Sequence, residues 1–321
     1  MDTLFIDRKN VSLETEAGRL IVRLPDARPS ILPLKQLRYV VLAARVELST
    51  TVLLALEQHG ITLVVTNPRQ SGNYLVCGGI NHGNTARRVA QVAWMLDDTR
   101  RLKAAKGIVA AKLLYQYQAL ARHQRRRPDL RRELTRGMRH IASRWRGVYG
   151  TESLNALRSI EGAAAAAYFE AFANLFAPSW QFSGRKKRPP PDPVNAILSL
   201  TYTLMHGEAV HALLSCGLDP AVGALHDLYY YRESLACDLV ELLRPHCESW
   251  VVDLFRQRLL NPSHFQQVQG GACLLSKEGR SLYYPACHQK MVEWRARLRS
   301  LASRWAQRVD NEHRCVGGGF L

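Results

Sequence analysis

A chain of 321 residues is long enough to bury a sizeable core, and its length suggests about two domains. Lys and Arg outnumber Asp and Glu by 44 to 27, so the formal charge of +17 points to a polyanionic partner, with nucleic acid first among them. The seven scattered cysteines never form Cys-x-x-Cys, which argues against a disulfide framework or a zinc ribbon. We expect reduced thiols, a cytoplasmic location and no membrane span.

The first 80 or so residues carry short patterns typical of strands. Three runs alternate apolar and polar positions between turn residues and predict a small meander: TLFID, VSLET and RLIVRLP. Two later runs, RYVVLAARVEL and ITLVVTN, predict further strands. Between these two, STTVLLALEQHG begins with Ser and Thr and ends at Gly60, which predicts a short helix.

From about Asn84 onward the patterns are long, helical and charged on one face. PVNAILSLTYTLMHG, for example, predicts a core helix. We therefore place a domain boundary near residue 83. The predicted fold class is α+β, with a small β-rich N-terminal domain (1–83) followed by a larger all-α domain (84–321).

Two segments of the helical part are strongly basic. RHQRRRPDLRRELTRGMRHIASRWR carries ten arginines against two acids, and such side chains bind phosphates by releasing counterions. SGRKKRPPPDP joins four basic residues to a proline run, which predicts an exposed loop able to grip a phosphodiester backbone. The alternatives are a solvated helix face for the first segment and a plain linker for the second.

One stretch, GALHDLYYYRESLACDLVELLRP, contains two acids at helical spacing. Ser234 is a candidate N-cap and Pro245 a candidate stop for this helix. Asp238 and Glu241 are three residues apart and therefore share a face. The earlier His226 precedes a turn-like segment that could bring it back to the same helix.

Two carboxylates and an imidazole suit Mn²⁺ or Mg²⁺ better than zinc. The alternative is structural: His226 packs in the core, and the acids form ion pairs with Arg232 or Arg244. Spacing alone does not decide between the two.

A third carboxylate, Glu161, precedes five alanines in SIEGAAAAAYFEAF. On a helix its neighbours are Ala164, Ala165 and Tyr168, so nothing larger than a methyl group crowds the acid for a full turn. The alanines therefore keep the carboxylate accessible. Alternatively, they allow a tightly packed helix pair, with Glu161 placed near the helix N-terminus.

Three motifs occur in an order that resembles the CRISPR-associated protein one family, the integrase that inserts new spacers into CRISPR arrays: IEGAAAAAYF, PPPDPVNAILSLTYTL and GALHDLYYYRESLACDLVELLRP. The resemblance implies a metal-dependent DNA endonuclease and integrase that uses Mg²⁺ or Mn²⁺. Glu161, His226 and Asp238 match the family's catalytic, metal-binding triad, and Glu241 matches a nearby supporting acid.

The same resemblance implies how DNA and partner proteins bind. The 3′-hydroxyl end of a captured DNA fragment would attack a phosphodiester at the edge of a CRISPR repeat. Two homodimers, each formed through the N-terminal domains, would flank a small CRISPR-associated adaptation partner. Six residues are candidates for contact with DNA: Arg88, Lys112, Arg185, Lys186, Lys187 and Arg188. Asn195 and Ser234 would support the site.

Tyr229, Tyr230 and Tyr231 have two interpretations. They could stack on an unpaired base near the end of the fragment, or they could pack in the core, which we favour from the sequence.

Three other functions fit parts of the pattern. A transposase with a similar core usually carries further DNA-binding modules. A basic nucleic-acid-binding protein would keep the acids only for structure. A repair nuclease for branched DNA would share the triad and differ in its substrate.

Overall fold

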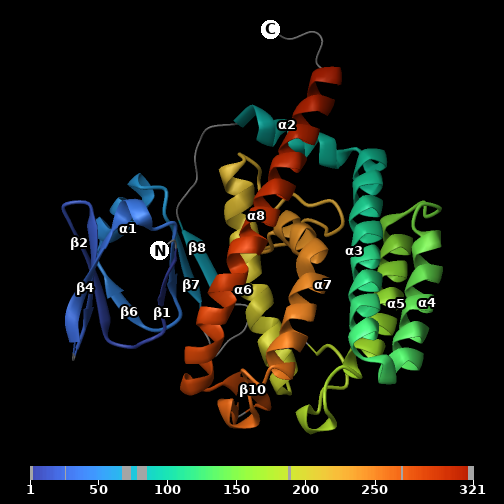
Figure 1. Cartoon of the computed structure of the whole chain (residues 1–321). Coiled ribbons are helices and arrows are strands. Elements are labelled where there is room, and N and C mark those ends of the chain that lie inside the picture. Colours follow the sequence, from blue (N-terminus) through green and yellow to red (C-terminus); the bar gives the residue numbers. More distant parts are fainter. Residues whose placement is uncertain are drawn as a thin grey trace. The chain divides into compact units, whose positions relative to one another are not determined.

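The computed structural model describes residues 3–25, 27–66, 74–77, 85–186, 189–268 and 270–316. The chain divides into two compact units, Met1–His82 and Gly83–Leu321. Strands dominate the first unit and helices the second, which confirms the predicted α+β class (Figure 1). Within the described residues, no helix combines the length and apolar character needed to cross a membrane.

The N-terminal unit contains two four-stranded sheets and helix α1 (Thr50–Gln58). The first sheet has the order β1-β5-β7-β8, with β8 antiparallel to β7 and the other pairs parallel: β1 (Thr3–Ile6), β5 (Tyr39–Leu42), β7 (Thr62–Thr66) and β8 (Tyr74–Cys77). The second has the order β4-β3-β2-β6: β2 (Val11–Glu16), β3 (Arg19–Leu24), β4 (Ala27–Pro33) and β6 (Val46–Leu48). Apolar residues of both sheets and of α1 share one core.

The predicted meander is only partly correct. VSLET and RLIVRLP do pair as antiparallel β2 and β3, but TLFID lies in the other sheet, parallel to β5. RYVVLAARVEL is two strands, β5 and β6, which belong to different sheets. Alternation of apolar residues identifies a half-buried strand but does not specify its partner. The sequence pattern therefore could not predict which strands pair. The helix ending at Gly60 is confirmed, and Gly60 has φ 63°.

The C-terminal unit is built from seven long helices among the described residues: α2 (Thr85–Leu96), α3 (Asp98–Arg126), α4 (Arg131–Gly147), α5 (Leu154–Ala173), α6 (Pro193–Ser215), α7 (Ser234–Arg256) and α8 (Lys277–Val316). Side chains cap the starts of α3, α5 and α6, where Asp97, Ser153 and Asp192 accept backbone N–H groups. A hairpin of β9 (Phe265–Val268) and β10 (Ala272–Leu275) is the exception to the predicted all-α composition.

Helix α7 differs from the prediction at both ends. Ser234 is its first residue rather than its N-cap, which is Glu233; the Glu233 side chain makes no capping hydrogen bond and contacts His206 instead. The predicted stop at Pro245 is wrong, because the helix continues to Arg256. Pro245 cannot donate to the carbonyl of Glu241, but buried packing on both sides of the proline holds the helix together. The helical face that contains Glu241 therefore continues as far as Glu248.

Helices α4 and α5 pack closely because their contact contains small residues. Gly137 of α4 faces α5, and a Cβ atom placed on it would lie 2.5 Å from the Cβ of Ala171. Ala164, within the alanine run, is completely buried. The close helix pair considered for the alanine run is thus present, but Glu161 is the eighth residue of α5, well inside the helix.

We predict opposite effects for the same substitution at two helical glycines. Gly137→Ala should lower the free energy of unfolding by about 1–3 kcal/mol, because α4 and α5 must separate to admit the methyl group. Gly107→Ala, in α3 with nothing within 4 Å of the added carbon, should raise it by about 0.5–1 kcal/mol. Thermal unfolding of both variants provides the test, and equal effects would contradict the close packing.

Candidate active site

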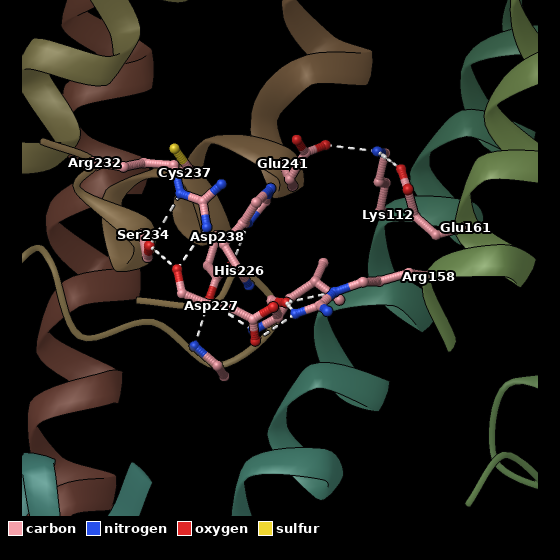
Figure 2. A network of polar contacts seen from close by, with 12 residues as sticks. Lys112, Arg158, Glu161, His226, Asp227, Arg232, Ser234, Cys237, Asp238 and Glu241 are labelled. Atoms are coloured by element: carbon pink, nitrogen blue, oxygen red, sulfur yellow. Dashed lines mark hydrogen bonds and ion pairs between the residues drawn. The ribbon is translucent and has the colours of Figure 1, made fainter. Parts of the chain in front are cut away.

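The loop that precedes α7 is held by one buried carboxylate. Asp238 is fully buried, and its Oδ2 accepts the backbone N–H groups of Ala224 (2.6 Å) and Leu225 (3.0 Å). Its Oδ1 lies 3.1 Å from the backbone nitrogen and 2.6 Å from Nδ1 of His226. Asp238 therefore fixes both the loop backbone and the orientation of the imidazole (Figure 2). The contact uses Nδ1, so Nε2 is the ring nitrogen that Asp238 does not bind.

The other two acids converge on a lysine. The Nζ of Lys112, from α3, binds Glu161 of α5 and lies 2.6 Å from Oε2 of Glu241 on α7 (Figure 2). Only 7% of the Lys112 side chain is exposed, compared with 24% for Glu161 and 5% for Glu241. Arg244 of α7 also binds Glu241. Two carboxylates and two cations thus form a nearly buried cluster between three helices.

Charges within this cluster set the protonation of its members. Burial alone would raise the pKa of the Glu241 carboxyl, but Arg244 and Lys112 hold it well below its ordinary value. Burial would likewise lower the pKa of Lys112, yet Glu241 and Glu161 raise it. The carboxylate and the ammonium therefore both stay charged.

A cavity of about 460 Å³ opens beside Glu161, and its wall contains three cationic and three acidic side chains. Lys112, Arg185 and Arg244 all contribute to its wall. The guanidinium carbons of the two arginines lie 5.4 Å and 4.8 Å from the centre of the Tyr202 ring, so this ring orders both. The cavity therefore offers cationic side chains to an anion beside Glu161, with acids in the same wall.

The predicted triad is brought together only in part. Among the described residues, no three His, Cys, Asp or Glu side chains are grouped so as to hold a metal ion. Glu161 and Glu241 share Lys112, whereas chain donors occupy both oxygens of Asp238. The acid that shares a partner with Glu161 is therefore Glu241, which we predicted only as a supporting acid.

The candidate DNA contacts differ in exposure. Lys112 is buried and bound to two carboxylates, and its contact with DNA stays a prediction. Arg185 is half-buried and donates to Asn195 and Ser199, whereas Lys186 is exposed. Arg88 is half-buried. The remaining two candidates, Lys187 and Arg188, lie outside the described residues.

The two predicted supporting residues each tie a loop to a helix. Asn195 is fully buried, donates to Gly184 O and accepts from Arg185, which joins the basic loop to the start of α6. Ser234 donates from Oγ to the backbone oxygen of Asp227 at 2.6 Å. Both side chains thus fix the position of segments that border the cluster.

Sequence reasoning missed several residues that hold the site. Asp227 binds Arg101 of α3 at 2.5 Å and Arg158 of α5 at 2.7 Å, and Arg158 also donates to Leu225 O at 2.7 Å. Arg158 precedes Glu161 by three residues, a spacing that places both on one face of α5. That spacing was a usable signal. No sequence signal indicated the contact of Asp227 with Arg101, which lies 126 residues away in the chain.

The three consecutive tyrosines are not in the core, contrary to the favoured interpretation. Their exposed fractions are 72% for Tyr229, 79% for Tyr230 and 91% for Tyr231. The loop from Asp227 to Ser234 is closed on itself by hydrogen bonds, so its middle projects outward.

Converging carboxylates with an imidazole nearby, beside a cavity whose wall contains arginines, are typical of enzymes that cut or join phosphodiesters. The model of the family described as CRISPR associated protein Cas1 matches residues 4–289. The chain belongs to this family of CRISPR-associated endonucleases.

Individual comparisons agree with this assignment. A CRISPR-associated endonuclease Cas1 from Thermodesulfovibrio yellowstonii is 34% identical over 99% of this chain and 100% of its own length. A casposase bound to an integration product has a TM-score of 0.83 at 18% identity, covering 97% of this chain and 91% of its own. A Cas6-RT-Cas1–Cas2 complex contains a chain with a TM-score of 0.84 at 21% identity, covering 97% of this chain and 35% of its own. The two structures show that the fold is shared.

We predict that Lys112→Met destabilises the protein when no divalent metal is present. The substitution leaves two neighbouring carboxylates with less positive charge, and breaking a buried ion pair from one side costs about 3–5 kcal/mol of unfolding free energy. Mn²⁺ should restore part of this loss. The measurement is thermal unfolding in EDTA and in Mn²⁺.

Lys103→Met is the matched control, because Lys103 is an exposed lysine of the same helix. It should change stability little in either buffer. If Lys112→Met were as stable as this control in EDTA, Lys112 would not be needed to hold the two acids together.

Proposed function

We propose that this Cas1 family protein is a metal-dependent DNA integrase that joins captured DNA fragments to a CRISPR array. The observation that carries the proposal is the convergence of Glu161 and Glu241 on one buried cation, beside a cavity whose wall contains Arg185 and Arg244. The casposase with a similar fold was captured with an integration product, which supports joining rather than cutting alone.

The donor set suits a hard divalent ion. Glu161 and Glu241 would supply carboxylate oxygens, and His226 would supply Nε2, a combination that favours Mg²⁺ or Mn²⁺. Asp238 would act as the carboxylate that orients this histidine, because its oxygens already accept four chain donors. This revises the triad expected from the resemblance, with Glu241 in place of Asp238. Lys112 must leave the space between the acids when the ion binds.

The proposed reaction is a direct transesterification. The 3′-hydroxyl oxygen of the fragment forms a new bond to a phosphorus at the edge of the repeat, and the bond from that phosphorus to the repeat strand's 3′ oxygen breaks. The attacking hydroxyl loses its proton and the departing 3′ oxygen gains one. A bound divalent ion would supply charge stabilisation at the phosphate and lower the pKa of the attacking hydroxyl.

The chain's own groups would position the reacting strand. Arg185 and Arg244 lie in the cavity wall with ordered guanidinium groups and would neutralise the phosphate charge. Lys186, exposed next to Arg185, would contact the backbone further out, together with Arg88. The wider excess of positive charge would supply binding that is independent of sequence.

We further propose that the protein works as a homodimer, formed through the N-terminal unit, with two dimers flanking a small partner. One structural neighbour is a complex that contains Cas1 and Cas2, which makes a Cas2-type protein the first partner to test. Such an arrangement places two active sites at the two ends of one DNA fragment.

The test is strand transfer of a short labelled duplex into a supercoiled plasmid that carries a CRISPR repeat, with Mn²⁺ or Mg²⁺ and the partner supplied. We expect the wild type to join the DNAs, and Glu161→Gln and His226→Ala to bind DNA but lose joining by about 100-fold or more. A plasmid without the repeat and a branched DNA serve as competing substrates. If branched DNA were cut efficiently and no joining occurred, a repair nuclease would be the better assignment.

The roles of Glu241 and Asp238 can be separated by neutral substitutions. Glu241→Gln should abolish Mn²⁺ binding, measured by electron paramagnetic resonance, because it removes a ligand. Asp238→Asn should weaken Mn²⁺ binding only about 10- to 100-fold and lower the melting temperature, because it loosens the loop and the imidazole. Complete loss of Mn²⁺ binding in Asp238→Asn alone would restore Asp238 as a direct ligand.

A further inference from the structure

Gln91 of helix α2 is a fully buried polar side chain to which the proposed mechanism gives no role. Its amide binds the connection between α6 and α7. Nε2 donates to the carbonyl oxygens of Asp219 (2.9 Å) and Val222 (3.1 Å), and Oε1 accepts the backbone N–H of Asp219 (2.8 Å). Both N–H groups of the amide and its oxygen are therefore bound to one segment, which we define as the 219–222 turn.

The 219–222 turn caps the start of helix α7. Pro220 O accepts the backbone N–H of Leu235 at 2.8 Å, and the backbone nitrogen of Ala236 lies 3.4 Å from the same oxygen. These two N–H groups belong to the first turn of α7, where no carbonyl of the helix itself reaches them. Because the side chain of Glu233 makes no capping hydrogen bond, the backbone of the turn serves as the cap. The start of α7 therefore depends on where this turn lies.

The residues that follow the turn form the loop that Asp238 holds. Gly223 joins the two segments so closely to α7 that an added Cβ atom would lie 2.6 Å from the backbone of Ser234. Asp238 then binds the backbone from Ala224 to His226. The connection is thus held by α2 just before this loop and by α7 within it. A shift of the turn would move both the imidazole and the start of the helix that carries Asp238.

Helix α2 is itself anchored on the side that carries Gln91. Arg87, one turn earlier, donates from Nη1 to the oxygen of Cys216, the C-cap of α6, at 2.5 Å. Its Nε and Nη2 bind Asp310 of α8 at 2.8 Å and 2.6 Å. Trp94 packs edge-on against a tryptophan of α8, with ring centroids 5.6 Å apart (Figure 1). Side chains at this spacing share a helical face, so α2 is a firm support for the connection.

The 219–222 turn requires the donors and the acceptor of an amide. A carboxylate at position 91 would place a second oxygen against two carbonyl oxygens. An apolar side chain would leave the N–H of Asp219 without this acceptor. At a buried position, an unsatisfied backbone group costs more free energy than a hydrogen bond contributes.

We propose that Gln91 is a positioning residue for the active site, which acts through the 219–222 turn to fix the His226 loop and the start of α7. The consequence for the reaction rests on the proposed function, in which His226 binds the metal ion. Loss of the Gln91 hydrogen bonds would then lower turnover and metal affinity. It would leave duplex DNA affinity unchanged, since exposed basic side chains supply that binding.

The test compares two variants of the full-length protein. Gln91→Met keeps the length of the side chain but neither donates nor accepts. Gln91→Glu keeps the acceptor for Asp219 N–H and replaces the two N–H donors by an oxygen. The control is Leu134→Ala, a fully buried change on α4, a helix that packs against α3 and α5 and carries no member of the Lys112 cluster.

The first measurement is hydrogen–deuterium exchange of the metal-free protein, which does not depend on catalysis. In both Gln91 variants, amides of residues 219–226 and of the first turn of α7 should exchange about 10-fold faster or more than in the wild type. Leu134→Ala should exchange there as the wild type does, although its melting temperature falls.

The second measurement is strand transfer together with Mn²⁺ binding by electron paramagnetic resonance. Gln91→Met should lower both kcat and Mn²⁺ affinity about 10-fold, because it acts through a group that orients a ligand. The KM for DNA and the affinity for duplex DNA in EDTA should not change. Gln91→Glu should change kcat and Mn²⁺ affinity in the same direction.

Three results would overturn the positioning role. One is wild-type exchange of residues 219–226 in both Gln91 variants. Another is faster exchange throughout the C-terminal unit, as for general loss of stability. A third is faster local exchange with unchanged kcat and Mn²⁺ affinity, which would limit Gln91 to supporting the start of α7. Failure of the proposed function is separate, since the wild type itself would then neither join DNA nor bind Mn²⁺, whereas the exchange result would stand.

Discussion

The candidate site depends on the ammonium group of Lys112. It lies between Glu161 and Glu241, so one positive charge holds together side chains from α3, α5 and α7 (Figure 2). Two buried carboxylates at this separation would repel each other and push two helices apart. With the lysine between them, the acids are kept ionised and close before any substrate arrives. The same feature limits the site, because another cation can enter only where the lysine leaves.

Asp238 supplies the second constraint, and it acts on backbone rather than on charge. A buried carboxylate that accepts several N–H groups replaces the regular secondary structure that the segment from Ala224 to His226 lacks. Gly223 is required just before it, since a Cβ atom there would meet the backbone of Ser234 at 2.6 Å. The loop therefore lies directly on α7, where Asp238 holds His226 and the three tyrosines remain exposed.

The sequence predicted what depends on local pattern. The α+β class, the α6 helix and the acids on one face of α7 all follow from periodicity and composition. It did not predict the partners of strands β1 and β5, which are set by long-range pairing. The spacing that places Asp238 and Glu241 on one face does not indicate that these acids and Glu248 are buried. Whether a buried acid binds a metal, a lysine or a backbone amide is decided by other helices, which no spacing within α7 records.

Those buried acids of α7 are neutralised in three different ways. Asp238 is satisfied by backbone amides and His226. Burial raises the pKa of Glu248 and favours its neutral form, although the hydrogen bond that it accepts from the Tyr202 hydroxyl at 2.5 Å acts in the opposite direction. Glu241 alone of the three is matched by a flexible side chain from another helix. In the proposed function a divalent ion would replace that lysine, and the bonds by which Asp238 holds the loop do not involve Lys112. On α7, Asp238 therefore holds the imidazole in a fixed position, whereas Glu241 would exchange its lysine partner for a metal ion.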